Sequence, residues 1–270
     1  MQSDTASLIK PKSLLVGLAV KWRVIIALVG REMVTSYGNR KLGYIWALLE
    51  PTAFIIIFLI IRVYIRDKLP FGESALLFMM TGIVTFRLFI ALGSRTLSAI
   101  TANQGLLTYP QVRPMDAIFA RIVMQSLTMI VIMVLFYIGI SILEDVRIIV
   151  HPGRFTLGVI LTLYVGAGVG SLNAVVASIL PSWTAIWSML SLPLLIMSGI
   201  FYVPIELPPA AQSVLFWNPV IHCVEIVRSS SYLSYHTFAE FNYPIAFATI
   251  CLTLCLAIER LFRNIILSGT

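Results

Sequence analysis

Six long apolar stretches constrain this chain more than any other feature of its sequence. They cover residues 45–65, 75–93, 117–143, 155–180, 184–203 and 243–261. Most of them reach the roughly 20 residues that an α-helix needs to cross a bilayer core. The chain is 59% hydrophobic and 11% charged, whereas soluble domains average about 25% charged residues. The sequence therefore predicts an all-α integral membrane protein with six transmembrane helices.

Basic residues are distributed unevenly between the two sides of these spans. With the N-terminus in the cytoplasm, thirteen of the 19 Lys and Arg residues lie inside and six lie outside. Cytoplasmic loops of membrane proteins carry such an excess, so both termini are expected to be cytoplasmic. The same bias accounts for the net charge of +7, and no nucleic-acid partner is expected.

Residues 1–44 are expected to form a cytoplasmic N-terminus with an amphipathic helix, and residues 45–270 the membrane domain. Residues 1–20 mix polar and basic positions and are expected to be loosely ordered. Between Lys21 and Tyr37, apolar residues recur at helical spacing and the charged residues fall largely elsewhere on the helix. This pattern is typical of a helix that lies in the membrane interface. Its apolar residues are Trp22, Ile25, Ile26, Val29 and Met33.

The entry to the first span combines features that a simple crossing does not need. A Leu42–Gly43 step precedes the aromatic residues Tyr44 and Trp46, which are types that collect at the membrane–water boundary. Glu50–Pro51 follows just inside the span. Pro removes a helix hydrogen bond, and a carboxylate in the membrane is costly unless it is paired or near water.

The loop between the second and third spans, residues 95–116, is long and polar. Its first part is predicted to be helical up to Gly105 and to turn after it, because Tyr109-Pro110 and Arg113-Pro114 follow. Loops of this length in compact proteins are usually functional or disordered. A short cytoplasmic helix that a soluble partner grips and a simple surface connector are both open.

Small residues and prolines mark the fourth and fifth spans. Gly166 and Gly170 form a GxxxG pair within an apolar helix, which predicts close packing against another helix. The surrounding GAGVG is not a dinucleotide-binding loop, because the third glycine is misplaced and no βαβ unit surrounds it. Pro193 is expected to kink the fifth span.

Residues 204–232 are amphipathic and interrupted by four prolines. Pro209 is predicted to open one short helix, and Asn218-Pro219 to cap and open another. Neither is long enough to cross a membrane, so we expect a pair of re-entrant half-helices before the last span. Glu225 and Arg228 are spaced to pair at i,i+3. A simple cap on the helix bundle is the alternative.

The chemistry that is missing is also informative. The chain has no GxxxxGK[ST] loop for ATP and no mid-span carboxylate or histidine for a proton relay. His151, His222 and His236 are expected to be solvated in outer loops, and Cys223, Cys251 and Cys255 give no disulfide framework or metal site. A transporter with these features requires a partner that supplies its energy.

The interfacial helix, KLGYIWALLEP, the six spans and SGIFYVPIELP…NPVIHCVEIVR together resemble the permease subunits of ABC-type-2 exporters. The group 2 capsular polysaccharide export permeases are the most similar, and the O-antigen permeases come next. The resemblance covers essentially the whole chain. It implies a subunit of a bacterial inner-membrane exporter that moves lipid-linked capsular polysaccharide out of the cytoplasm. O-antigen, teichoic-acid-type polymer or small-molecule export are the alternatives.

The resemblance also implies partners and sites. It implies a homodimer with a channel at its interface, two ATP-binding subunits that carry ATP and Mg²⁺, a periplasmic or outer-membrane export partner, and no cofactor in this chain. The expected coupling residues are Arg95, Asn103, Gln104, Tyr109, Arg113 and Asp116. The expected entrance residues are Arg31, Tyr37, Arg40, Lys41, Leu42, Gly43 and Tyr44. Channel candidates are Trp46, Phe54, Phe58, Phe86, Trp187 and Tyr202, and outer-exit candidates are Gln212, Trp217, Asn218, Glu225 and Arg228.

Two other classes of function remain open from the sequence. A membrane-embedded glycosyl or lipid transferase would need acidic residues near the interface, and only the scattered Glu50, Asp116 and Glu259 qualify. A structural subunit without a pore would not need the interrupted helices of residues 204–232. An ATPase that copurifies with the chain would separate the exporter from both.

Overall fold

The computed structural model describes residues 14–37, 74–109, 111–143 and 148–268, with isolated positions between 49 and 72. The described part of the chain is helical and contains no strand, which confirms the all-α prediction. Four of its helices are long and apolar enough to cross a membrane. They are α3 (Ala75–Arg95), α5 (Pro114–Leu143), α6 (Pro152–Ile179) and α10 (Asn242–Leu261).

The first and fifth predicted spans differ from these four. Most of residues 45–65 lie outside the described residues, although Leu49 and Ile60 are helical. The fifth span forms α7 (Trp183–Met197), which contains Pro193 and ends six residues before the predicted limit. Gly199 turns the chain there with a φ of +68°, and Asn218 Nδ2 donates to the carbonyl of Met197 over 3.2 Å. An external donor therefore satisfies part of the helix end.

The N-terminal helix α1 (Leu14–Tyr37) begins seven residues before the predicted Lys21. Residues 14–20 were expected to be loosely ordered. That prediction was wrong because Leu14, Leu15, Leu18 and Ala19 are favourable helix formers that extend the helix backwards. Trp22, Ile26 and Met33 are more than half exposed, so α1 keeps an apolar side available to a membrane surface.

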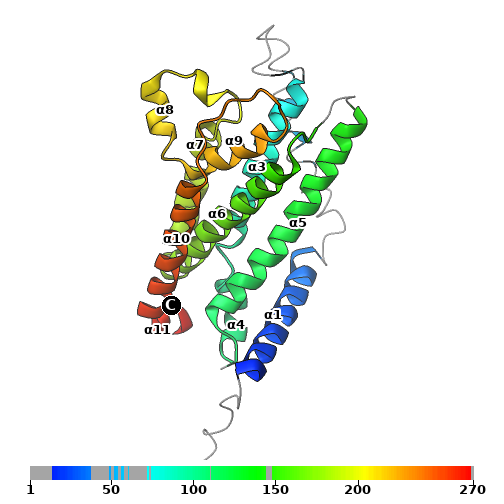
Figure 1. Cartoon of the computed structure of the whole chain (residues 1–270). Helices are drawn as coiled ribbons and strands as arrows, with labels where there is room; N and C mark the ends of the chain where they lie inside the picture. The colour runs from blue at the N-terminus through cyan, green and yellow to red at the C-terminus, as the bar shows by residue number, and fades with distance from the viewer. Residues whose placement is uncertain are drawn as a thin grey trace, which may run out of the picture.

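The helices form an elongated bundle around α6 (Figure 1). Helix α6 packs against α3, α10 and α9 (Pro219–Ser229), and α1 runs beside α5. The short helices α4 (Gln104–Leu107) and α11 (Arg263–Ser268) lie at one end, together with the described C-terminal residues. Helices α8 (Pro209–Leu215) and α9 lie at the opposite end. The predicted loop 95–116 and the predicted half-helices therefore occupy opposite ends of the bundle.

Helix α3 is the most deeply buried of the four membrane-length helices. In its most apolar window 72% of the residues are buried, compared with 22% for α5. Phe78, Met80, Leu88 and Leu92 of α3 are essentially fully buried. Helix α5 thus presents most of its apolar surface outwards, to lipid or to other protein.

The glycine pair of α6 packs as the sequence predicted. A Cβ atom at Gly166 would lie 2.7 Å from Leu92 Cδ1, and one at Gly170 would lie 2.7 Å from the carbonyl oxygen of Leu92. On another side of α6, a Cβ at Gly168 would lie 2.8 Å from the carbonyl oxygen of Ala248 in α10. The glycines therefore allow the backbones of α3 and α10 to approach α6 closely.

Gly170→Ala is expected to lower the free energy of unfolding by about 1–3 kcal/mol, because a backbone oxygen cannot move aside as a flexible side chain can. Gly139→Ala in α5 is the matched control, since nothing lies within 4 Å of its added Cβ. Titration with SDS in mixed micelles measures both changes. Equal stability of the two variants would refute the close approach of α6 and α3.

The short helices show where local sequence decides structure. Helices α8 and α9 begin at Pro209 and Pro219 as predicted, and Asn218 Oδ1 accepts from the N–H of Val220 over 3.0 Å. The loop 95–116 contains η1 (Thr101–Asn103) and α4. Gly105 lies inside α4, so the helical part does not end there as expected. Gly105 has a φ outside the positive region and open space around it, so it can continue a helix.

Candidate functional site

Polar contacts fasten α1 to the start of α5 and to the loop 95–116. Lys21 Nζ lies 2.6 Å from Asp116 Oδ1. Glu32 Oε1 lies 2.6 Å from Arg121 Nη2. Arg31 Nη1 donates to Asn103 Oδ1. We call these six residues the α1 clamp: Lys21, Arg31, Glu32, Asn103, Asp116 and Arg121.

Arg121, in α5, contacts three other segments of the chain. Besides its ion pair with Glu32, its Nη1 donates to the carbonyl of Arg95 over 3.1 Å and to Ser98 Oγ over 2.7 Å. It thereby links α1, the C-terminal end of α3 and the first turn of the loop. Ion pairs on an exposed surface contribute about 0–1 kcal/mol. The Glu32–Arg121 side chains are only 9% and 14% exposed, so the loss of one partner would leave a poorly solvated charge.

Two predicted coupling residues lie inside the clamp. Asn103 is buried and also donates through Nδ2 to the carbonyl of Ala99. Asp116 lies in the first turn of α5, where its Oδ2 accepts from the N–H of Arg113 over 3.0 Å. In this chain both residues are buried and bind side chains of α1, and their role in coupling stays a prediction.

Three other predicted coupling residues face outwards. Gln104 and Arg113 are exposed, and Tyr109 is 60% exposed. They lie between the end of η1 and the start of α5. This exposed part of the loop is a surface that another protein could contact. Arg95, the sixth residue, lies at the end of α3 and lines a cavity.

Two of the predicted entrance residues lie in the described part of the chain. Arg31 belongs to the clamp, and Tyr37 is the last residue of α1. The remaining entrance residues lie outside the described residues: Arg40, Lys41, Leu42, Gly43 and Tyr44. The channel candidates Trp46, Phe54 and Phe58 lie outside them as well.

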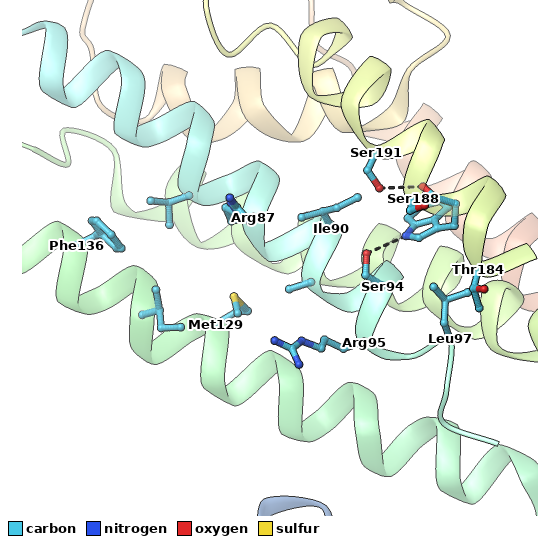
Figure 2. Close-up of a pocket in the computed structure, with 14 residues that line it drawn as sticks. Arg87, Ile90, Ser94, Arg95, Leu97, Met129, Phe136, Thr184, Ser188 and Ser191 are labelled. Atoms are coloured by element: carbon cyan, nitrogen blue, oxygen red, sulfur yellow. Dashed lines mark hydrogen bonds between the residues drawn. The ribbon is translucent and has the colours of Figure 1, made fainter. Parts of the chain in front are cut away.

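A cavity of about 440 Å³ opens between α3, α5 and α7 (Figure 2). Arg87 and Arg95 come from α3, Met129 and Phe136 from α5, and Ser188 from α7. A second cavity of about 260 Å³ adjoins it at Ser94 and Arg95 and extends to the α1 clamp. A third, of about 250 Å³, adjoins it at Arg87, Ile90, Ser188 and Ser191 and extends to Phe201.

Two of the three described channel candidates, Phe86 and Trp187, line these cavities. Phe86 is buried and packs against Phe89 with ring centroids 6.2 Å apart. Trp187 is only 5% exposed, and its ring lies against Gly93. Its Nε1 donates to Ser94 Oγ over 2.9 Å. Within one chain, therefore, neither ring presents an open face on which a sugar could stack. Tyr202 is half-buried and donates to the carbonyl of Ile196.

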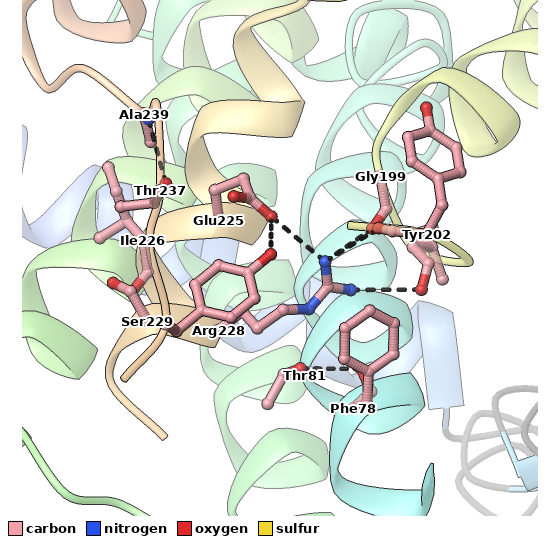
Figure 3. Close-up of polar contacts among 12 residues, drawn as sticks. Phe78, Thr81, Gly199, Tyr202, Glu225, Ile226, Arg228, Ser229, Thr237 and Ala239 are labelled. Atoms are coloured by element: carbon pink, nitrogen blue, oxygen red, sulfur yellow. Dashed lines mark hydrogen bonds and ion pairs between the residues drawn. The ribbon is translucent and has the colours of Figure 1, made fainter. Parts of the chain in front are cut away.

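At the opposite end of the bundle, Arg228 holds the turn that follows α7 (Figure 3). Its Nη1 donates to the carbonyl of Gly199 over 2.7 Å, and its Nη2 to that of Ile200 over 3.2 Å. Glu225 Oε1 lies 3.2 Å from Nη1 and also accepts from Tyr235. The guanidinium carbon lies 3.9 Å from the centre of the Phe78 ring.

The Glu225–Arg228 pair is confirmed, but its environment differs from the predicted exit. Both side chains are fully buried, so they do not line an open path through this chain. Asn218 is also buried, as the cap of α9. Trp217 is 74% exposed, and Gln212 is half-buried and donates to the carbonyls of Ile205 and Leu207.

His222 is buried, so the prediction that it is solvated in an outer loop is wrong. It lies in α9, fully buried, with Nε2 2.9 Å from the carbonyl of Phe216 and Nδ1 accepting from the N–H of Glu240. It packs edge-on against the Phe216 ring. Its contacts are those of a packed core residue. Among the described residues, no group of three His, Cys, Asp or Glu side chains could hold a metal ion.

Sequence reasoning missed several residues of the site. Lys21 and Glu32 of the clamp are eleven residues apart, close to three helical turns, so they share a side of α1. This spacing could have predicted a charged side of α1 that packs against another helix. The hydroxyls of Ser94, Ser188 and Ser191 gave no signal, because isolated serines are common in apolar helices.

Comparison with known proteins identifies the family. Residues 23–232 match the family described as ABC-2 type transporters. The polysialic acid transport protein KpsM of Escherichia coli is 31% identical over 245 residues, which cover 90% of this chain and 95% of that protein. The capsule polysaccharide export inner-membrane protein BexB of Haemophilus influenzae is 30% identical, over 78% of this chain and 80% of its own.

A third relative extends the comparison. The capsule polysaccharide export inner-membrane protein CtrC of Neisseria meningitidis serogroup A is 25% identical over 80% of this chain and 82% of its own. The family match spans well over half of the chain, and the described residues form membrane-length helices with the expected glycine-mediated packing. This chain therefore belongs to the ABC-2 type transporter family.

Proposed function

We propose that this chain is the inner-membrane permease subunit of an ATP-driven exporter of lipid-linked capsular polysaccharide. The observation that carries the proposal is the match along most of the chain to relatives whose names specify capsule polysaccharide export or polysialic acid transport. Export of an O-antigen, a teichoic-acid-type polymer or a small molecule has no comparable support.

The energy for transport comes from a separate ATPase that docks on the exposed part of the loop 95–116. Two features support this site. The loop lies at the same end of the bundle as α11, where the proposed orientation places the cytoplasm. The α1 clamp ties the inner side of the loop to α1 and α5. A displacement of the outer side by the ATPase would therefore also move α1 and α5.

Assembly as a homodimer with two ATPase subunits follows from the same proposal. Helix α7 leaves Met189 and Leu192 more than 60% exposed, and a second permease subunit or lipid would cover them. A periplasmic or outer-membrane partner would receive the polymer at the end that carries α8 and α9. Both termini lie in the cytoplasm in this arrangement.

Ala102→Pro and Arg113→Glu are expected to uncouple the exporter. Pro in η1 removes a backbone donor, since the N–H of Ala102 donates to the carbonyl of Ser98 over 2.9 Å. Charge reversal at the exposed Arg113 alters the docking surface itself. We expect each variant to insert in the membrane, and surface capsule to fall at least tenfold. Copurification of a Walker-motif subunit, its ATP hydrolysis and surface capsule are the measurements.

Arg263→Glu is the matched control for Arg113→Glu, because it reverses an exposed charge at the same end of the bundle but outside the loop. It should leave assembly and export unchanged. If no Walker-motif subunit copurifies with the wild-type chain, the proposed function is wrong. If both loop variants assemble, hydrolyse ATP and export like the wild type, only the docking site is wrong.

A further inference from the structure

The three adjoining cavities form one groove along α3 and α7. The inner cavity at the α1 clamp shares Ser94 and Arg95 with the central one, and the central one shares Arg87 and Ser188 with the outer one. The groove therefore extends from the clamp to Phe201, beside the turn that Arg228 holds.

The described residues that line the central cavity include the basic side chains of Arg87 and Arg95 but no acidic ones. The nearby carboxylates are already paired: Glu32 with Arg121 and Asp116 with Lys21. Charged residues within membrane helices are costly, and they usually face a water-filled cavity or mark a substrate path.

Arg95 is placed to bind a ligand at the mouth of this groove. It is the last residue of α3, its side chain is exposed, and its guanidinium extends into the space beside α5 (Figure 2). Its backbone carbonyl is held by Arg121, so the side chain projects from a fixed point. A guanidinium offers five donors in a planar fork that fits carboxylates and phosphates.

Serine hydroxyls beside Arg95 complete a polar wall. Ser94 Oγ accepts from Trp187 Nε1, which leaves its own proton to donate. Ser188 and Ser191 donate to the carbonyls of Ala185 and Trp187, which leaves oxygen lone pairs that can accept from sugar hydroxyls. Such a wall can bind an acidic sugar through both its charge and its hydroxyls.

We propose that Arg95 and the serine wall of the α3–α7 groove bind the anionic groups, carboxylate or phosphate, of the exported polymer. This rests on the proposed function. It assigns Arg95 to substrate binding rather than to ATPase coupling. Arg87 lies eight residues before Arg95 in α3, about 12 Å away at ~1.5 Å per residue, and lines the same cavity.

The test places a single cysteine at Ser188, which is exposed, in the full exporter complex in nanodiscs of neutral lipid. The three native cysteines are buried, so the parent chain gives the background rate. Small anionic and cationic methanethiosulfonate reagents report the local potential. Arg95→Gln should slow the anionic reagent about fivefold. This corresponds to about 1 kcal/mol, the attraction between two unit charges about 4 Å apart in water. Arg95→Lys should restore the rate, and Arg263→Gln should not change it.

The second measurement adds a ligand. A soluble oligomer of sialic acid should slow labelling of the Ser188→Cys chain at least threefold, a neutral oligoglucose should not, and inorganic phosphate should compete with the acidic oligomer. Arg95→Gln should abolish this protection. Protection that appears only when anionic lipid is added to the nanodisc would assign Arg95 to lipid head groups and overturn the proposal. Equal rates for both reagents, with no protection, would also overturn it. Capsule export by the wild-type complex, assayed separately, shows whether the proposed function itself holds.

Discussion

Arg228→Met is expected to lower the free energy of unfolding by about 3–5 kcal/mol, because it leaves the buried Glu225 carboxylate without its counter-ion. The substitution also removes the donors to the carbonyls of Gly199 and Ile200, and a buried carbonyl without a partner costs about 1–3 kcal/mol. Methionine fills a similar volume, so a cavity is not the main cause. Unfolding of the purified chain by SDS in mixed micelles measures the loss.

A second variant separates the two causes. Glu225→Gln together with Arg228→Met removes both charges, and buried ion pairs can often be replaced by neutral residues at little cost. The double variant should recover part of the lost stability but not the part that comes from the 199–202 turn. Arg154→Met, at an exposed position of α6, is the matched control and should stay within about 0.5 kcal/mol of the wild type.

The outcome bears on function as well as on stability. If Arg228→Met is as stable as the control, the buried network does not hold the end of α7. If Arg228→Met is destabilised and α9 unfolds before the other helices, the network stabilises α9 rather than the whole bundle. Export by the double variant, measured as surface capsule, would then show whether the fixed turn is needed for transport.

Local features of this chain could be predicted from its sequence. The starts of α8 and α9, the Asn218 cap, the Glu225–Arg228 pair and the close packing at Gly170 all depend on residues within one or two helical turns, or on one small residue. Helical spacing and capping chemistry are local properties, and sequence shows them directly.

Long-range partners could not be predicted in the same way. Lys21 and Asp116 are 95 positions apart, and Arg228 and Gly199 are 29 apart. Spacing places Glu225 beside Arg228. It does not show that both are buried, or that the guanidinium donates to the carbonyls of Gly199, Ile200 and Tyr202. The early end of α7 has the same origin, because Asn218, twenty-one positions away, binds the carbonyl of Met197.

Glu32→Lys is expected to reduce surface capsule at least tenfold. The new lysine would place a positive charge beside Arg121, at a site where the native pair is only 2.6 Å apart. The repulsion should separate α1 from α5, and the loop 95–116 should lose its contact with α1. The ATPase should still assemble, since Gln104, Tyr109 and Arg113 remain exposed. We therefore expect ATP hydrolysis by the purified complex to persist while export fails, the behaviour of an uncoupled exporter.

A charge swap tests the pair itself. Glu32→Arg with Arg121→Glu restores an ion pair between α1 and α5, so export should recover in part. Recovery should be incomplete because the swapped carboxylate at position 121 cannot donate to the carbonyl of Arg95 or support Ser98 as the guanidinium does. Arg23→Glu, which reverses an exposed charge on α1 outside the clamp, should export normally. Normal export by Glu32→Lys would show that the clamp is not needed to couple ATP hydrolysis to export. Export by the swap variant that is no better than export by either single variant would show the same.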